Sequence, residues 1–216
     1  MRFLCVLYLV CAASLSAQTI LNEEFWAEVA PLVPQDAEQT VSLDTALKRI
    51  LEEGRYVFSG MIFGFSFSYT PLDRGRNIQE EFTLEPAFQI PFGDPNLFVY
   101  QTRREGPRVY ARLRYRLHEF QESWYEGTHS NILSSSSGEG KASLFAGYQE
   151  KISAIRDSLK NAVREYARGR IDNKPLKVTG TVFFDGAPRV EILSGSFRAL
   201  SSVRLKIDDV VTYGVY

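Results

Sequence analysis

The stretch Tyr56-Val-Phe-Ser-Gly-Met-Ile-Phe-Gly-Phe-Ser-Phe-Ser-Tyr69 alternates large and small side chains from Gly60 onward. A period of two is typical of a β-strand, because successive side chains point to opposite faces of a sheet. One face would carry the bulky residues Met61, Phe63, Phe65, Phe67 and Tyr69. The other would carry Gly60, Ile62, Gly64, Ser66 and Ser68, which is nearly bare backbone that another element can approach closely. We therefore expect a central strand whose aromatic side is buried.

Other segments alternate in the same way and are the expected sheet partners of this strand. They are 82–90, 97–102, 108–117, 176–184, 189–193, 203–207 and the tail 210–216. The turn sequences Glu105-Gly106-Pro107 and Asp185-Gly186 predict hairpins, in which neighbouring strands pair antiparallel. Pro86 has no N–H to donate, so the strand that contains it is expected at a sheet edge or a bulge.

Helical periodicity is clearest in two segments. Ser42 is suited to cap a helix that ends near Gly54, and apolar residues recur every three or four positions from 141 to 168. A short helix over 22–29, followed by a linker over 31–39, is expected at the N-terminal side. The long helix is expected to pack on the sheet; pairing with a partner helix is the alternative.

Two features lie between these elements. The apolar phase changes after His118, which predicts a bulge or bend near Glu119. The stretch 126–140 contains Ser134–Ser137 with flanking glycines and is expected to be a flexible loop.

Together these patterns predict an α+β fold. It would have a mostly antiparallel sheet of about seven strands, a short N-terminal helix and one long amphipathic helix packed on the sheet. A chain of 216 residues is long enough for one such domain. We expect a signal peptide over 1–17, the short helix and linker over 18–41, and a single domain over 42–216.

The N-terminal segment has the layout of a secretory signal. Arg2 is the only charged residue before Glu23, an apolar run follows it, and small residues end at Ala17. That run is too short to cross a bilayer as a helix. Both cysteines, Cys5 and Cys11, lie inside the segment, so the exported chain would have no disulfide, thiolate metal site or cysteine nucleophile. Without Arg2 the chain has 24 basic and 26 acidic residues, a net charge of −2.

A row of basic residues is the main candidate binding surface. Arg108, Tyr110, Arg112, Arg114, Arg116 and His118 all fall on one side of the strand predicted over 108–117. We select Tyr110, Arg112, Arg114 and Arg116 as binding residues, because guanidinium groups match phosphates, sulfates and carboxylates. The simpler interpretation is cross-strand ion pairing, for which Glu81, Glu85, Glu119 and Glu122 are available.

Catalytic and cofactor patterns are weak. Thr128-His129-Ser130 places a histidine beside hydroxyl groups, but no Gly-x-Ser-x-Gly turn is present and the chain has two histidines. The acidic pairs Glu80-Glu81 and Asp208-Asp209 lack calcium-loop spacing, and no phosphate-binding glycine loop precedes a helix. We therefore expect no enzymatic activity, metal, cofactor or nucleotide.

These observations favour an exported, non-enzymatic assembly or binding module of the periplasm or cell envelope. Its expected partner is an envelope protein or an anionic envelope component, such as a lipid headgroup or a polysaccharide. The slightly negative net charge argues against nucleic acid. Two alternatives are a small outer-membrane β-barrel and a periplasmic carrier that encloses a hydrophobic ligand against its phenylalanine-rich face.

Overall fold

The computed structural model describes residues 18–30, 41–171 and 174–213, and within them the chain is an α+β protein with antiparallel sheets. A three-stranded sheet has the order β1-β5-β4, formed by Ile20–Glu28, Arg108–Arg116 and Leu97–Glu105. A six-stranded sheet has the order β3-β2-β7-β9-β6, formed by Glu81–Pro86, Phe65–Thr70, Lys177–Phe184, Ser196–Val211 and Ser134–Ser143, and β8 (Arg189–Leu193) also pairs with β9. The expected signal peptide and linker lie outside the described residues.

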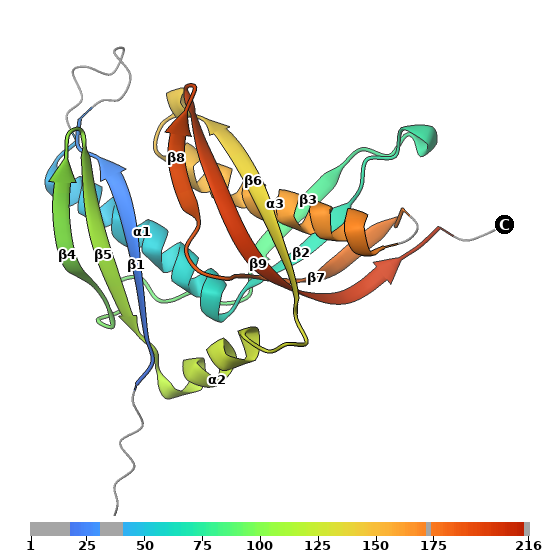
Figure 1. Ribbon diagram of the computed structural model, residues 1–216, viewed down its shortest axis with the longest axis horizontal. Coiled ribbons are helices and arrows are strands. Elements are labelled where there is room, and N and C mark those ends of the chain that lie inside the picture. Colours follow the sequence, from blue (N-terminus) through green and yellow to red (C-terminus); the bar gives the residue numbers. More distant parts are fainter. Residues whose placement is uncertain (1–17, 31–40, 172–173, 214–216) are drawn as a thin grey trace, which may run out of the picture.

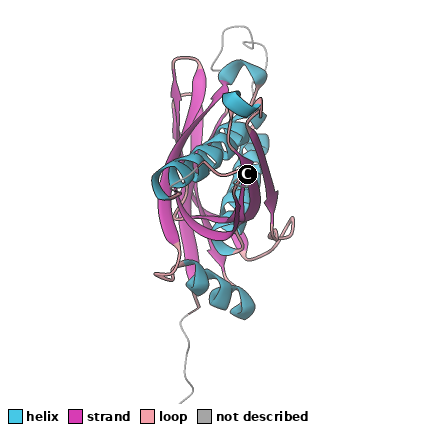
Figure 2. Ribbon diagram, turned by 90° about the vertical axis from the view of Figure 1, so that its right-hand side faces the viewer, coloured by secondary structure: helices cyan, strands magenta, loops and turns pink. Residues whose placement is uncertain are grey.

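Three α-helices complete the described part: α1 (Leu43–Ile62), α2 (Glu119–Thr128) and α3 (Gln149–Arg170). Helix α1 lies behind the three-stranded sheet, and α2 lies at its lower end (Figure 1). The long helix α3 packs on β6 and β9 of the larger sheet, which confirms the expected packing. Seen from the side, α1 and α3 lie between strands on the left and on the right, and α2 lies below them (Figure 2).

The expected central strand begins later than the sequence pattern indicated. Helix α1 is capped by Ser42 as expected, but it runs past Gly54 to Ile62, and the strand β2 starts at Phe65. The helix continues because Val57, Phe58, Met61 and Ile62 extend its buried stripe. Gly64, with a φ of 72°, then turns the chain into β2. From Phe65 onward the prediction is confirmed, since Phe65, Phe67 and Tyr69 are buried on β2, which has a paired strand on each side.

The short helix expected over 22–29 is wrong. Residues Ile20–Glu28 form strand β1, which pairs antiparallel with β5 over its whole length. Leu21, Phe25 and Ala27 are buried on the side that faces α1. A helix this short is only marginally stable by itself, so pairing with the free edge of β5 determines the conformation of the segment.

The flexible loop expected over 126–140 is also wrong. The serine–glycine run belongs to the edge strand β6, which pairs with β9 from Ser134 to Ser143. Its small side chains let α3 approach the strand closely: a Cβ atom at Gly138 or Gly140 would overlap main-chain atoms of the helix. The small serine and glycine residues, which are typical of a loop, here allow β6 and α3 to pack closely.

Three smaller expectations need correction. The phase change after His118 marks the start of α2, where the side-chain oxygen of Gln121 accepts from the main-chain N–H of His118 at 2.9 Å. The long helix begins at Gln149, later than the sequence indicated. The segment β8 pairs with β9 and not with β7, so the tight turn lies at Ser194-Gly195. The β4–β5 hairpin and the edge position of the strand that ends at Pro86 are confirmed.

Candidate anion-binding face

The predicted binding residues lie together on one face of β5, the middle strand of the three-stranded sheet. Val109, Ala111, Leu113 and Tyr115 are buried on the side that faces α1. Tyr110, Arg112, Arg114 and Arg116 alternate with them and occupy the opposite face. We call this surface the arginine face; it also includes Phe98, Tyr100 and Arg103 from β4, Glu24 from β1, and Arg108.

One carboxylate on this face pairs with two of the arginines. Glu24 lies 2.9 Å from a guanidinium nitrogen of Arg103 and 3.4 Å from one of Arg112. The hydrogen bond from Arg103, followed by the charges of both arginines, holds the pKa of Glu24 below its usual value. The acidic partners named from the sequence do not make these pairs. Glu24 was missed because its segment was assigned to a helix, whereas the register of β1 places it opposite Arg112.

Aromatic rings support the other guanidinium groups. The guanidinium carbon of Arg114 lies 3.4 Å from the ring centroid of Tyr100, and that of Arg116 lies 5.3 Å from the ring centroid of Phe98. In the same way, the guanidinium carbon of Arg103 lies 4.1 Å from the ring centroid of Tyr110. Such cation–π contacts hold a guanidinium near a ring while its N–H groups can still donate to solvent or to a ligand.

A β-bulge in β4 produces this arrangement. The register with β5 shifts between Val99 and Gln101, so Tyr100 is the extra residue. Beyond the bulge, Phe98 pairs with Arg114 and therefore lies on the arginine face. Uninterrupted alternation along β4 would have placed Val99 opposite Arg114. The aromatic character of Phe98 and Tyr100 was visible in the sequence, but their side of the sheet was not.

Arg114 and Arg116 are the residues most available to a ligand. Among the described residues, no carboxylate oxygen lies within 4.0 Å of either guanidinium group. Two positions on one strand face are about 7 Å apart. The pair can therefore hold two anionic groups, or two oxygens of one larger anion, through charge-assisted hydrogen bonds.

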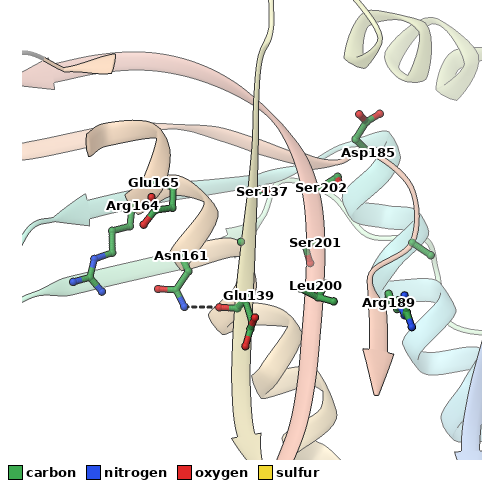
Figure 3. Close-up of a pocket in the computed structure, with 12 residues that line it drawn as sticks. Ser137, Glu139, Asn161, Arg164, Glu165, Asp185, Arg189, Leu200, Ser201 and Ser202 are labelled. Atoms are coloured by element: carbon green, nitrogen blue, oxygen red, sulfur yellow. Dashed lines mark hydrogen bonds between the residues drawn. The ribbon is translucent and has the colours of Figure 1, made fainter. Parts of the chain in front are cut away.

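A cavity beside α3 is a weaker candidate. It has a volume of about 710 Å³ and lies between α3, β6, β9 and the turn before β8 (Figure 3). Its charged groups already have partners: Glu139 pairs with Arg198, Arg164 lies 3.7 Å from Glu80, and Asp185 lies 3.2 Å from Arg204. The amide of Asn161 donates to the main-chain oxygen of Glu139 at 2.7 Å. Few of its polar groups are left to recognise a ligand.

His129, which the sequence suggested as a possible catalytic residue, makes hydrogen-bond contacts with residues that are close to it in the chain. The Nδ1 atom of His129 lies 2.9 Å from the main-chain oxygen of Tyr125 and 3.1 Å from the hydroxyl of Thr128. These contacts close the end of α2. Within the described ranges, His, Cys, Asp and Glu side chains form no group of three that could hold a metal ion. The helices in those ranges include none that is both long enough and apolar enough to cross a membrane.

Comparison with known proteins places the chain among relatives. An uncharacterised protein of Treponema pallidum (strain Nichols) is 29% identical over 208 residues, which cover 94% of this chain and 86% of that protein. No solved structure matches the chain significantly. One protein-family model matches residues 9–213. Because that match extends over almost the whole chain, this protein belongs to the family that the model defines.

Proposed function

We propose that this protein is an exported, non-enzymatic binding module that holds an anionic component of the cell envelope on its arginine face. The observation that supports the proposal is the set of contacts around the guanidinium groups of Arg114 and Arg116. Each guanidinium group is positioned by an aromatic ring, and neither has a carboxylate partner among the described residues. Phosphate, sulfate and carboxylate groups are the ligands that such arginines bind best.

The neighbouring residues support a limited site rather than a generally basic surface. Glu24 neutralises part of the charge of Arg103 and Arg112, whereas Arg114 and Arg116 make no such ion pair among the described residues. The net charge of the whole chain is −1, which provides no general attraction to polyanions. Recognition would therefore depend on this part of the sheet.

Binding to two anion sources tests the proposal. Vesicles that contain phosphatidylglycerol present lipid phosphates, and dextran sulfate presents a soluble anionic polymer. We expect binding to at least one of them, with an affinity that falls as salt is added. Changing Arg114→Ser and Arg116→Ser together should weaken it about 25-fold, since each arginine near an anionic surface contributes about fivefold.

A matched control separates the site from net charge. Arg168→Ser with Arg170→Ser removes the same charge from the C-terminal end of α3, on the side of the molecule away from β4 and β5 (Figure 1). The control should bind like the wild type. Equal losses in the two double variants, or no binding to either anion source, would overturn the proposal.

A further inference from the structure

A second cavity lies at the end of the arginine face. It has a volume of about 370 Å³ and is enclosed by the end of α1, the segment 88–94 and helix α2. We call it the aromatic cavity, and its apolar lining consists of Phe63, Phe88, Pro91, Phe120 and Trp124. Ligand pockets in proteins commonly have volumes of about 300–1,000 Å³ and largely apolar walls.

The rings of this cavity fix one another in place. Phe63, Phe88 and Trp124 form a triangle in which every pair of ring centroids is 5.7 Å apart, with interplanar angles between 61° and 84°. Edge-to-face contacts of this kind are favourable. Nevertheless Phe88 is 59% exposed, Phe120 is 61% exposed and Trp124 is 48% exposed. Large apolar side chains that gather at the surface in this way mark a binding site more often than scattered ones do.

Asp94 and Gln121, two polar residues that line the cavity, are already hydrogen-bonded to other groups of the protein. The carboxylate of Asp94 accepts hydrogen bonds from the Tyr115 hydroxyl at 3.2 Å and from the main-chain N–H of Asn96 at 2.9 Å. Its side chain is 6% exposed. Gln121 is buried; its side-chain amide donates to the same hydroxyl at 2.8 Å, and its side-chain oxygen accepts from the main-chain N–H of His118 at 2.9 Å. The cavity therefore offers apolar surface to a ligand rather than hydrogen bonds.

The mouth of the cavity is connected to the arginine face. His118, which lines the cavity, lies 3.0 Å from the side-chain amide of Asn96. The main-chain oxygen of Asn96 accepts from the N–H of Arg116 at 3.2 Å. Arg116 precedes His118 by two residues of extended chain, a distance of about 7 Å. Arg116 is therefore the arginine of this face that lies nearest along the chain to a residue lining the cavity.

From this juxtaposition we propose that the aromatic cavity binds the alkyl chain of an anionic single-chain amphiphile, whose carboxylate or phosphate lies on Arg116. The proposal rests on the proposed function of the arginine face and names the ligand class for that site. The positive charge of Arg116, about 7 Å along the strand from His118, and the apolar walls of the cavity match the two ends of such a molecule. Each further methylene group that enters the cavity should increase the affinity about fourfold.

Trp124 supplies a direct readout. The sequence has two tryptophans, and the other one, Trp26, is buried against Phe197 between the two sheets. We expect 11-bromoundecanoate to quench the fluorescence of Trp124 and to leave that of Trp26 unchanged. Quenching should disappear in the Trp124→Phe variant. Absence of quenching in the wild type, or equal quenching in the variant, would overturn the proposal.

Uncharged 11-bromoundecanol separates the role of the cavity from that of the arginine face. Arg116→Ser should weaken binding of the carboxylate about tenfold or more, because a charge-assisted hydrogen bond is lost, and should leave binding of the alcohol within twofold. Phe88→Ser should weaken the binding of both ligands. Phe145→Ser is a matched change at a phenylalanine that is 66% exposed and lies outside the cavity. It should not change the affinity for either ligand.

The outcomes distinguish the two proposals. Binding of phosphatidylglycerol vesicles or dextran sulfate without quenching by bromoundecanoate would refute the cavity assignment and leave the arginine face supported. Equal affinity of the Arg116→Ser variant and the wild type for bromoundecanoate would refute the placement of the anionic group, even if the chain still enters the cavity.

Discussion

The ammonium group of Lys151 on α3 lies 2.7 Å from a carboxylate oxygen of Glu53 on α1, and both side chains are almost completely buried. The same ammonium donates to the main-chain oxygen of Trp26 on β1 at 2.6 Å and lies 4.1 Å from the centre of its indole ring. The hydroxyl of Tyr148 is 3.0 Å from the Glu53 carboxylate, and burial raises the pKa of this tyrosine far above its usual value. One buried network therefore joins the helices that cover the two sheets.

Loss of one partner of this pair should be severe. Lys151→Met leaves the Glu53 carboxylate buried without its counter-charge, so we expect the free energy of unfolding to fall by about 3–5 kcal/mol. Urea denaturation measures it. The double variant Lys151→Met with Glu53→Leu removes both charges and should recover much of the loss. If the single and double variants unfold at the same urea concentration, the two charges are not coupled as described.

Close contact between β6 and α3 makes Gly140 difficult to replace. A Cβ atom at this position would overlap the main-chain oxygen of Ala154, and main-chain atoms cannot rotate away. We expect Gly140→Ala to lower the free energy of unfolding by about 1–3 kcal/mol. Gly127 in α2 has no neighbouring atom within 4 Å of such a Cβ, so Gly127→Ala should leave stability unchanged or raise it by about 1 kcal/mol. A flexible segment at 134–140 would instead tolerate both changes equally.

The ion pairs of Arg198 predict an acid-dependent loss of stability. Hydrogen bonds from Arg198 and Lys141 lower the pKa of Glu139 from 4.5 to about 2. The folded state therefore binds this proton less tightly than the unfolded state. The stabilisation is fully present above pH 4.5 and is lost as the pH falls toward 2. A carboxyl carbon titration by NMR should give a Glu139 midpoint near 2, and Arg198→Gln should move it back toward 4.5. A midpoint that stays near 2 in the variant would contradict this cause.

Tyr100 should contribute to ligand affinity without contacting the ligand. Its ring holds Arg114, and an exposed cation–π contact is worth about 0.5–1 kcal/mol, so Tyr100→Leu should weaken anion binding about two- to fivefold. Titration with phosphatidylglycerol vesicles or dextran sulfate measures the change. In an Arg114→Ser background the same substitution should have no further effect. Additive losses in the double variant would show that the ring acts independently of Arg114.

The strand that carries the arginine face was predictable because its pattern is local and unambiguous. Nine residues from Arg108 to Arg116 alternate apolar and polar side chains, which only a strand with one buried face can satisfy. The turn at 106–107 likewise fixed the β4–β5 hairpin. The cap at Ser42 marked the start of α1 correctly, because its hydroxyl accepts from the N–H of Thr45.

The partners of that strand were not predictable from the same information. Glu24 became a partner of Arg112 only because the segment 20–28 pairs with a free strand edge. Phe98 came to lie beside Arg114 only because a bulge shifted the register of β4. The residues of the aromatic cavity come from α1, α2 and the segment 88–94, which no short-range pattern connects.

By itself, the sequence determined the α+β class, the polar and apolar sides of β5 and the surface on which the arginines stand, because these depend on periodicity within one element. Tertiary structure alone decided that 20–28 is a strand, that the serine–glycine run packs under a helix and that α1 extends to Ile62. In each of these segments helix, strand and loop are close in intrinsic free energy, so contacts with distant residues select the conformation.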